Sequence, residues 1–169
     1  MLFRSIGLIY GTGVNICYSE SIDRISKLKN EDIPQGSKHM LINTEAGSYA
    51  GFDRGFCDIA IDEASGDPGS QLFEKMVSGA YFSVVVLCAL KLAAADGFFS
   101  ETTAEWICNQ DCLDPIAIDD FMREPLGSSQ IALNCAEEND SENIFFVIDN
   151  LYDRAAKLVA ITVTAVMVR

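Results

Sequence analysis

The sequence predicts an α/β domain in which strands come first and helices follow. Short β-prone runs lie within about residues 5–50, and apolar residues recur at helical spacing within about residues 70–168. There is no internal repeat and no low-complexity linker between the two parts. A chain of 169 residues suits one domain of ordinary size and is short for two. We therefore expect a single domain over residues 1–169.

The strands are expected in the first third of the chain. Two β-prone runs are joined at Gly11-Thr12-Gly13, which is typical of a hairpin with a tight glycine turn. Residues 21–28 fit either a helical turn or a continuation of the sheet edge, and the polar residues 30–38 indicate a loop. We expect strands over residues 5–10, 14–20 and 39–44.

Helical spacing dominates after Gly66. One helix is predicted from a Ser70 cap to about Asp96, with Gly97 ending it. A shorter helix opens at Asp114-Pro115. The last helix is expected over about residues 142–167, after an acidic run at 137–140 that we interpret as solvated.

Charge excludes several classes of partner. Twelve Lys plus Arg face 25 Asp plus Glu, a formal net charge of −13. Such a surface repels phosphate backbones and anionic lipids, so we expect neither nucleic-acid nor membrane binding. The apolar runs at 81–95 and 155–168 are shorter than the ~20 residues that span a bilayer, and they are interpreted as buried helices.

The six cysteines form no C-x-x-C pair. Cys108 and Cys112 have three residues between them, but the single His39 is far away in sequence, so a zinc site is weakly supported. Buried, reduced thiols in a cytoplasmic protein are the better interpretation, and no metal ligands are predicted in this chain.

Three short motifs carry polar chemistry. Gly11-Thr12-Gly13 is followed by Asn15, and two glycines allow positive φ, so that amides and the Thr12 hydroxyl can face one anion. Asn43-Thr44-Glu45 places an amide and a carboxylate at a strand end, a pair suited to sugar hydroxyls. Each motif also has an ordinary alternative, as a plain turn or a solvated strand end.

The third motif begins the long predicted helix. Gln71 and Glu74 lie three residues apart and share a face near its N-terminus, where the helix dipole favours a carboxylate. Gly79, one turn further on, leaves a notch for a ligand or another backbone. A first-turn acid and a packing glycine would explain the same residues.

Together these motifs resemble the eukaryotic-type hexokinase family, which includes the glucokinases. The matching segments are G-L-I-Y-G-T-G-V-N-I-C-Y-S-E, I-N-T-E-A-G-S-Y, D-P-G-S-Q-L-F-E-K-M-V-S-G-A-Y and D-R-A-A-K-L-V-A-I-T-V-T-A-V. Of these, Q-L-F-E-K-M-V-S-G is the most specific. The resemblance implies most of the large domain of the actin-like, ribonuclease H-like ATPase fold.

The resemblance also implies roles for individual residues. Hexose hydroxyls would be bound by Asn15, Glu45, Gln71 and Glu74. The nucleotide and its phosphates would face Gly11, Thr12, Gly13, Gly79 and Thr102. The Thr102 match is weaker, because Trp106 stands where the family has a small serine.

Two departures from the family pattern change packing around these residues. Ala46 and Tyr49 replace the Trp and Phe of I-N-x-E-W-G-A-F, which removes an indole from behind Glu45. Phe82-Ser83-Val84 replaces the usual L-G-E. The family's first phosphate loop (D-L-G-G-T-N), the N-D-T with the general base and the adenosine-binding glycine loop have no match here.

The implied function is ATP-dependent phosphorylation of a hexose at its 6-hydroxyl, with ATP and Mg²⁺ as the phosphoryl donor of the complete enzyme. This chain would supply sugar ligands and one phosphate-facing turn, and no catalytic residue. We expect it to be a piece of a larger fold whose remainder is its partner, and to be inactive alone. The alternatives are a non-catalytic sugar-binding or interaction module and, disfavoured by Q-L-F-E-K-M, another actin-like sugar kinase.

Overall fold

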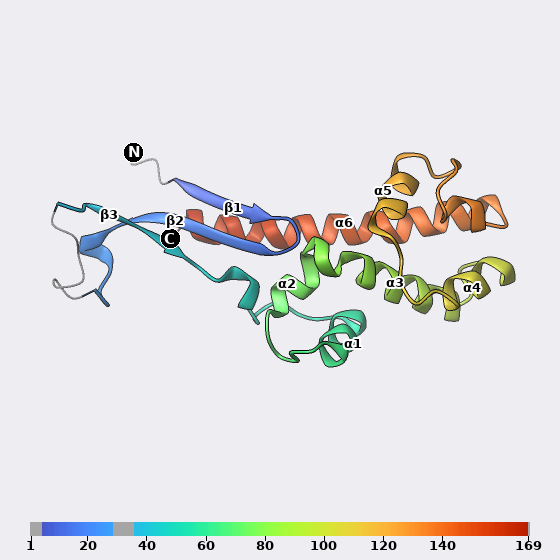
Figure 1. The fold of residues 1–169 in the computed structure, drawn as a ribbon, viewed down its shortest axis with the longest axis horizontal. Coiled ribbons are helices and arrows are strands. Elements are labelled where there is room, and N and C mark those ends of the chain that lie inside the picture. The colour runs from blue at the N-terminus through green and yellow to red at the C-terminus, as the bar shows by residue number, and fades with distance from the viewer. Residues whose placement is uncertain (1–4, 29–35, 169) are drawn as a thin grey trace.

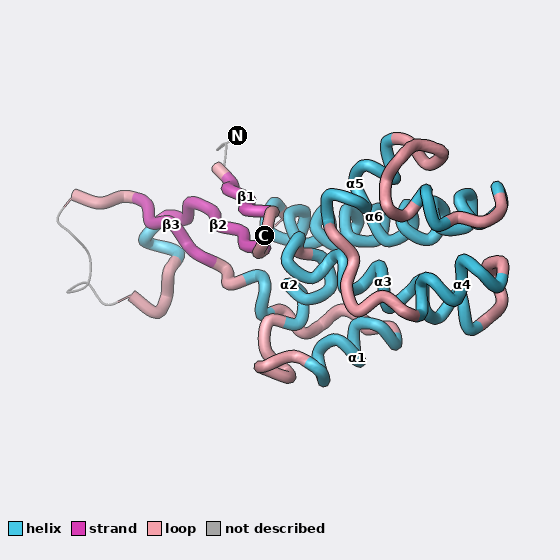
Figure 2. Tube along the Cα trace, turned by 45° about the vertical axis from the view of Figure 1, so that its right-hand side comes forward, coloured by secondary structure: helices cyan, strands magenta, loops and turns pink. Residues whose placement is uncertain are grey.

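The computed structural model describes residues 5–28 and 36–168, so most of the predicted loop at 30–38 lies outside the described residues. Strands gather at one end of the molecule and helices at the other (Figures 1 and 2). The strands are β1 (Ile6–Tyr10), β2 (Val14–Ser21) and β3 (His39–Asn43). The α-helices are α1 (Phe56–Ala64), α2 (Leu72–Val77), α3 (Gly79–Ala95), α4 (Glu101–Cys108), α5 (Pro115–Arg123) and α6 (Glu138–Met167).

The strands form one antiparallel sheet in the order β1-β2-β3, which confirms the predicted hairpin and third strand. Asn15 pairs with Ile9 and Cys17 with Asn43, so the start of β2 lies beside the end of β3. Burial alternates along β2, with Val14 and Ile16 almost fully buried. This face covers the C-terminal half of α6, along which the hairpin lies (Figure 1). A period of two is what a half-buried strand requires.

Two apolar clusters hold the elements together. One joins the sheet, α2 and α6 through Val14, Ile16, Phe73 and Val159. The other fills the helical end with side chains of α3, α4, α5 and α6, namely Val86, Leu90, Ile107, Ile118, Phe121, Ile144 and Ile148. Helix α6, with 30 residues, contributes to both clusters, so it is the element on which the sheet and the small helices both pack.

The long helix predicted from Ser70 to about Asp96 is wrong in two places. It is broken at Ser78, whose backbone is extended (φ −77°, ψ 154°), so that α2 and α3 are separate. Its cap is Gln71 and not Ser70. Its end is as predicted: Gly97 has φ +78° and its amide donates to the carbonyl of Ala94.

Two further predictions fail in the helical part. Helix α1, a short helix of nine residues, lies before residue 70, where no helix was expected. The acidic run 137–140 is not uniformly solvated, because Asp140 is 2% exposed and α6 already begins at Glu138. A carboxylate this deeply buried needs hydrogen-bond donors.

Asp140 finds four donors at the junction of α4 and α6. Its carboxylate accepts from the Ser100 amide (2.7 Å), the Ser100 hydroxyl (2.6 Å), the Thr103 hydroxyl (2.8 Å) and the Glu137 amide (3.0 Å). Burial raises the pKa of Asp140, but these hydrogen bonds outweigh it and leave the pKa below its usual value. One side chain therefore ties the first turns of two helices together.

We expect Asp140→Asn to destabilise the fold by about 2–3 kcal/mol at pH 7, because an amide presents hydrogens to donors that need an acceptor. A lowered folded-state pKa stabilises the fold above the unfolded-state value of about 3.9 and loses that contribution as pH falls through the folded-state value. The difference between the variant and the parent should therefore shrink in acid. Urea unfolding at pH 7 and at lower pH measures it.

Glu138→Gln is the matched control, since Glu138 is exposed in the same helix turn. We expect it to change the free energy of unfolding by less than about 0.5 kcal/mol. A control as damaging as Asp140→Asn would contradict the role given to the buried carboxylate.

Candidate functional site

The hairpin turn is joined to the break between α2 and α3. The Gly79 amide donates to the Gly11 carbonyl at 2.7 Å, and the Gly11 amide donates to the Gly13 carbonyl at 2.9 Å. A Cβ on Gly79 would lie 3.0 Å from the Gly11 oxygen, so only glycine allows this approach without a shift. The notch predicted at Gly79 is thus filled by another backbone.

The predicted reason for the turn glycines is wrong. Neither Gly11 nor Gly13 adopts a positive φ. A Cβ on Gly13 would instead lie 2.7 Å from Glu74 Oε2, so a larger residue there would displace this carboxylate. Gly11 has open space where a Cβ would point, and Thr12 is exposed, so one side of the turn is accessible to a ligand.

Asn15 and Glu45 are linked through Asn43 at the junction of β2 and β3. The Asn15 Nδ2 donates to Asn43 Oδ1 at 2.7 Å, and Asn43 Nδ2 donates to Glu45 Oε1 at 2.6 Å. The Asn15 Oδ1 in turn accepts from the amides of Ile16 (2.8 Å) and Ala46 (3.1 Å). Both Asn15 groups are therefore oriented by partners, and the carboxylate of Glu45 is fixed at the strand end.

Gln71 and Glu74 reach the same place from α2. Glu74 Oε2 accepts from the Val14 amide at 3.0 Å, and Gln71 Nε2 donates to the Ser48 hydroxyl at 3.0 Å. A Cβ on Gly47 would lie 2.5 Å from Gln71 Oε1 and 3.3 Å from Glu74 Oε2. The backbone at Gly47 thus lies against both side chains.

The structure therefore brings Asn15, Glu45, Gln71 and Glu74 together beside the hairpin turn. Hydroxyl-rich ligands suit this set, because carboxylates accept from hydroxyls while amides both donate and accept. Ser48 and the linking position of Asn43 between Asn15 and Glu45 were not predicted, and no spacing rule would have found them.

Two members of this group carry backbone strain. Glu45 (φ 51°, ψ 45°) and Gln71 (φ 49°, ψ 40°) are the non-glycine residues with positive φ in the described part of the chain. The left-handed region costs an L-residue about 1–2 kcal/mol, and such strain concentrates where side chains must be aimed. Two strained residues within one polar cluster support its functional importance.

Behind α2, Lys75 fixes the loop that precedes Gln71. Its side chain is 2% exposed, and its ammonium contacts Asp62 Oδ1 (2.9 Å), the Ser65 hydroxyl (2.9 Å) and both the carbonyl (2.9 Å) and the carboxylate (3.0 Å) of Asp67. Asp62 also accepts from the Gly69 amide at 3.0 Å. The role of Lys75 was not predicted, although a lysine inside an apolar helix run was the available signal.

The charges of this cluster stabilise one another. Hydrogen bonding from Lys75 keeps the pKa of Asp62 below its usual value. Burial lowers the pKa of Lys75, but the hydrogen bonds and charges of Asp62 and Asp67 outweigh it, so that pKa is raised. Lys75 therefore stays charged and the loop stays attached to α2.

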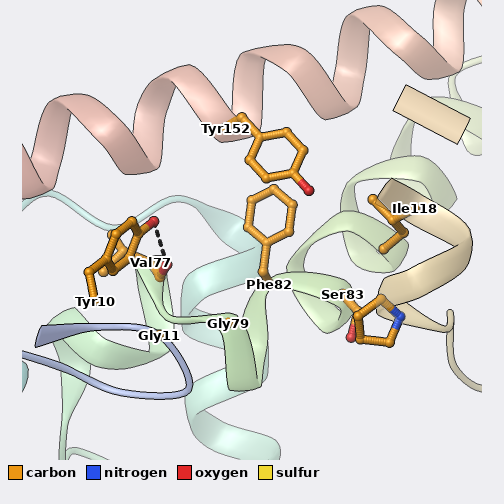
Figure 3. Close-up of a pocket in the computed structure, with 9 residues that line it drawn as sticks. Tyr10, Gly11, Val77, Gly79, Phe82, Ser83, Ile118 and Tyr152 are labelled. Atoms are coloured by element: carbon orange, nitrogen blue, oxygen red, sulfur yellow. Dashed lines mark hydrogen bonds between the residues drawn. The ribbon is translucent and has the colours of Figure 1, made fainter. Parts of the chain in front are cut away.

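On the other side of the turn lies a cavity of about 270 Å³ (Figure 3). Gly11, Gly79 and Ser83 line it, and Tyr10 closes one wall by donating from its hydroxyl to the Val77 carbonyl at 3.0 Å. Phe82 stacks on Tyr152 of α6 with ring centroids 4.3 Å apart. The F-S-V departure thus supplies an aromatic contact and a small residue at the cavity.

Thr102 is not part of this group. It is exposed in the first turn of α4, a helix at the end of the molecule away from the sheet (Figure 1). No group of three or more His, Cys, Asp or Glu within 5–28 and 36–168 could hold a metal ion. No helix in these same ranges is long and apolar enough to cross a bilayer.

The fold and the polar cluster together define a class of protein. A family model described as hexokinase matches residues 5–169. A solved hexokinase from Schistosoma mansoni, complexed with glucose, matches with a TM-score of 0.75 at 24% identity over 98% of this chain and 40% of that one. The architecture is that of hexokinases, an α/β fold of the actin-like ATPase group.

Curated relatives agree with this class. Glucokinase-1 of Kluyveromyces lactis is 31% identical over 182 residues, which cover 97% of this chain and 38% of that protein. Human Hexokinase-1 is 42% identical over 103 residues, covering 57% of this chain and 10% of the relative. The chain belongs to the hexokinase family, and it spans less than two fifths of the length of these relatives.

We expect Lys75→Met to destabilise the fold by about 3 kcal/mol, because it leaves acceptors around a buried site without their ammonium. Urea unfolding at pH 7 measures the change. Lys157→Met is the control: Lys157 pairs with Asp153 on the exposed face of α6, and its loss should cost less than about 1 kcal/mol. Equal losses in the two variants would show that the Lys75 cluster adds nothing beyond a surface ion pair.

Proposed function

We propose that this chain supplies part of the hexose pocket and one phosphate-facing turn of a kinase that transfers a phosphoryl group from ATP to the 6-hydroxyl of a hexose. One observation carries the proposal: Asn15, Glu45, Gln71 and Glu74, distant in sequence, meet beside the Gly11–Gly13 turn. Family membership supports sugar phosphorylation in general. The glucose bound by the Schistosoma mansoni hexokinase supports a hexose as the ligand.

The residues of the site have separate tasks in this proposal. Glu45 and Glu74 accept hydrogen bonds from sugar hydroxyls, the second hydrogen of Asn15 Nδ2 donates to one hydroxyl, and Gln71 Oε1 accepts from another. Because Glu45 and Glu74 already have protein partners on one oxygen, each carboxylate keeps its other oxygen for the sugar. The ligand set is thereby oriented before sugar arrives, which limits the entropy lost on binding.

The turn fits the phosphate end of a nucleotide. Gly11 is open where a side chain would stand and also lines the cavity beside Gly79, and Thr12 is exposed. Magnesium-bound ATP would bring the phosphoryl group and offset its negative charge when bound. The Thr12 hydroxyl and the turn backbone orient the phosphates toward the sugar side.

Glucose titration of ¹⁵N-labelled protein tests the sugar site. The side-chain amide signals of Asn15, Asn43 and Gln71 should shift together as glucose is added. Glu45→Gln and Glu74→Gln should each weaken binding about tenfold, because a charge-assisted hydrogen bond is lost. Glu63→Gln, at an exposed acid of α1, should leave the titration unchanged.

The proposal fails if glucose moves none of these amide signals. It also fails if the same shifts persist when Glu45 and Glu74 are both replaced, because the sugar would then be elsewhere. The backbone spectrum of each variant shows in the same experiment whether the fold is retained.

We further propose that the chain alone does not turn over. The residues that it matches in the family bind sugar and phosphate, and none of them is a general base for the sugar hydroxyl. Purified chain with glucose, ATP and Mg²⁺ should form no hexose 6-phosphate above the uncatalysed rate. Measurable turnover that Glu74→Gln abolishes would contradict this and would assign the whole reaction to this chain.

A further inference from the structure

A second groove lies at the end of α6 that is far from the sugar site. It has a volume of about 500 Å³ and runs between the N-terminal half of α6 and the loop after α5. Leu126 on the loop wall is 75% exposed and Phe146 on the helix wall is 67% exposed. Large apolar side chains on both walls of one groove are typical of an interaction site, whereas single exposed ones are ordinary.

The walls of this Leu126–Phe146 groove are fixed in place. Ser141, which is 2% exposed, donates from its hydroxyl to the Pro125 carbonyl at 2.8 Å and so ties the loop to α6. Below it, Ile144 and Ile148 are fully buried in the helical core, with Phe145 packed against them. The groove is therefore preformed, which reduces the cost of binding.

Three carboxylates form an acidic rim along the α6 side of the groove. Glu138, Glu142 and Asp149 line the groove from α6, and none of the three forms an ion pair within the described part of the chain. The nearby cation at the end of α5, Arg123, is already paired with Asp119 at 2.6 Å. The rim is thus an uncompensated negative surface on a chain whose net charge is −13.

We propose that the Leu126–Phe146 groove docks a basic amphipathic helix of a partner protein. The apolar face of that helix would cover Leu126 and Phe146, and its Lys or Arg residues would pair with Glu138, Glu142 and Asp149. From residue 138 to 149 the groove side of α6 advances about 16 Å, which matches about three turns of a partner helix.

Charge argues against two other occupants, a second copy of this chain and an anionic membrane. A second copy of this chain also carries −13 and would bring repulsion to an acidic rim. An anionic lipid surface is repelled for the same reason. A bare metal ion is excluded because the carboxylates are spread along the groove and form no metal-binding group among the residues described.

Fluorescence anisotropy with a synthetic peptide tests the proposal. The probe is a labelled helical peptide of about 14 residues with Leu at positions i, i+3, i+4 and i+7 and Lys on both flanks. A second peptide has Glu in place of every Lys. The basic peptide should bind, its affinity should fall on raising the salt from about 50 to about 500 mM, and the acidic peptide should not bind.

Variants separate this groove from general attraction to an acidic protein. Glu142→Lys and Phe146→Ser should each weaken binding of the basic peptide about tenfold. Phe56→Ser and Glu63→Lys on α1 are matched controls, since Phe56 is as exposed as Phe146 at 67% and Glu63 is an exposed helix acid. Neither should change the affinity.

Several results would overturn the inference. The first is that the α1 variants weaken binding of the basic peptide as much as the groove variants do. The others are that the basic and acidic peptides bind equally well, or that the basic peptide does not bind the parent protein. Sedimentation adds one more: a dimer of the parent that Phe146→Ser dissociates would make a second copy the occupant. The dissociation constant for glucose should be the same in the groove variants as in the parent protein. This keeps the test of the groove independent of the sugar site.

Discussion

The hydrogen bond from the Gly79 amide to the Gly11 carbonyl is the interaction on which the rest of the site depends. In a continuous helix that amide would donate four residues back, to Lys75. Donating to the hairpin instead ends α2 at Val77 and starts α3 at Gly79. The same contact sets the hairpin over α2, where Glu74 reaches the Val14 amide at 3.0 Å. A single backbone hydrogen bond thus couples the helix break, the turn and the position of Glu74.

Sequence periodicity identified the hairpin, β3, α5 and most of α6, because each has a run whose pattern matches its burial. It could not find the break at Ser78, since the apolar spacing continues across it and the cause is a turn more than sixty residues away. Asp140 was misjudged for a related reason. Glu137 and Glu138 before it are exposed, and its donors at Ser100 and Thr103 come from the start of another helix.

The candidate site, like the fold, was only partly predictable from the sequence. The motifs alone allowed ordinary turns and solvated strand ends, and the hexose role of the four polar residues was predicted from the resemblance to a family. Their convergence is seen only in the structure. Two further residues of the same motifs support them, with roles that no spacing rule shows: Ser48 orients Gln71, and Lys75 fixes the preceding loop. The strained backbones of Glu45 and Gln71 are tolerated because this surrounding network compensates them, an arrangement that no local propensity encodes.

Helix α6 gives the two ends of the molecule one support while keeping them separate. At about 1.5 Å per residue its 30 residues extend about 45 Å. Ala155 and Val159 lie under the sheet, whereas Ile144 and Ile148 anchor the helical core beside the acidic groove. Effects of substitutions this far apart with no shared partners are expected to add. A chain organised in this way can change what binds at its acidic end without moving the residues that meet around the hairpin turn.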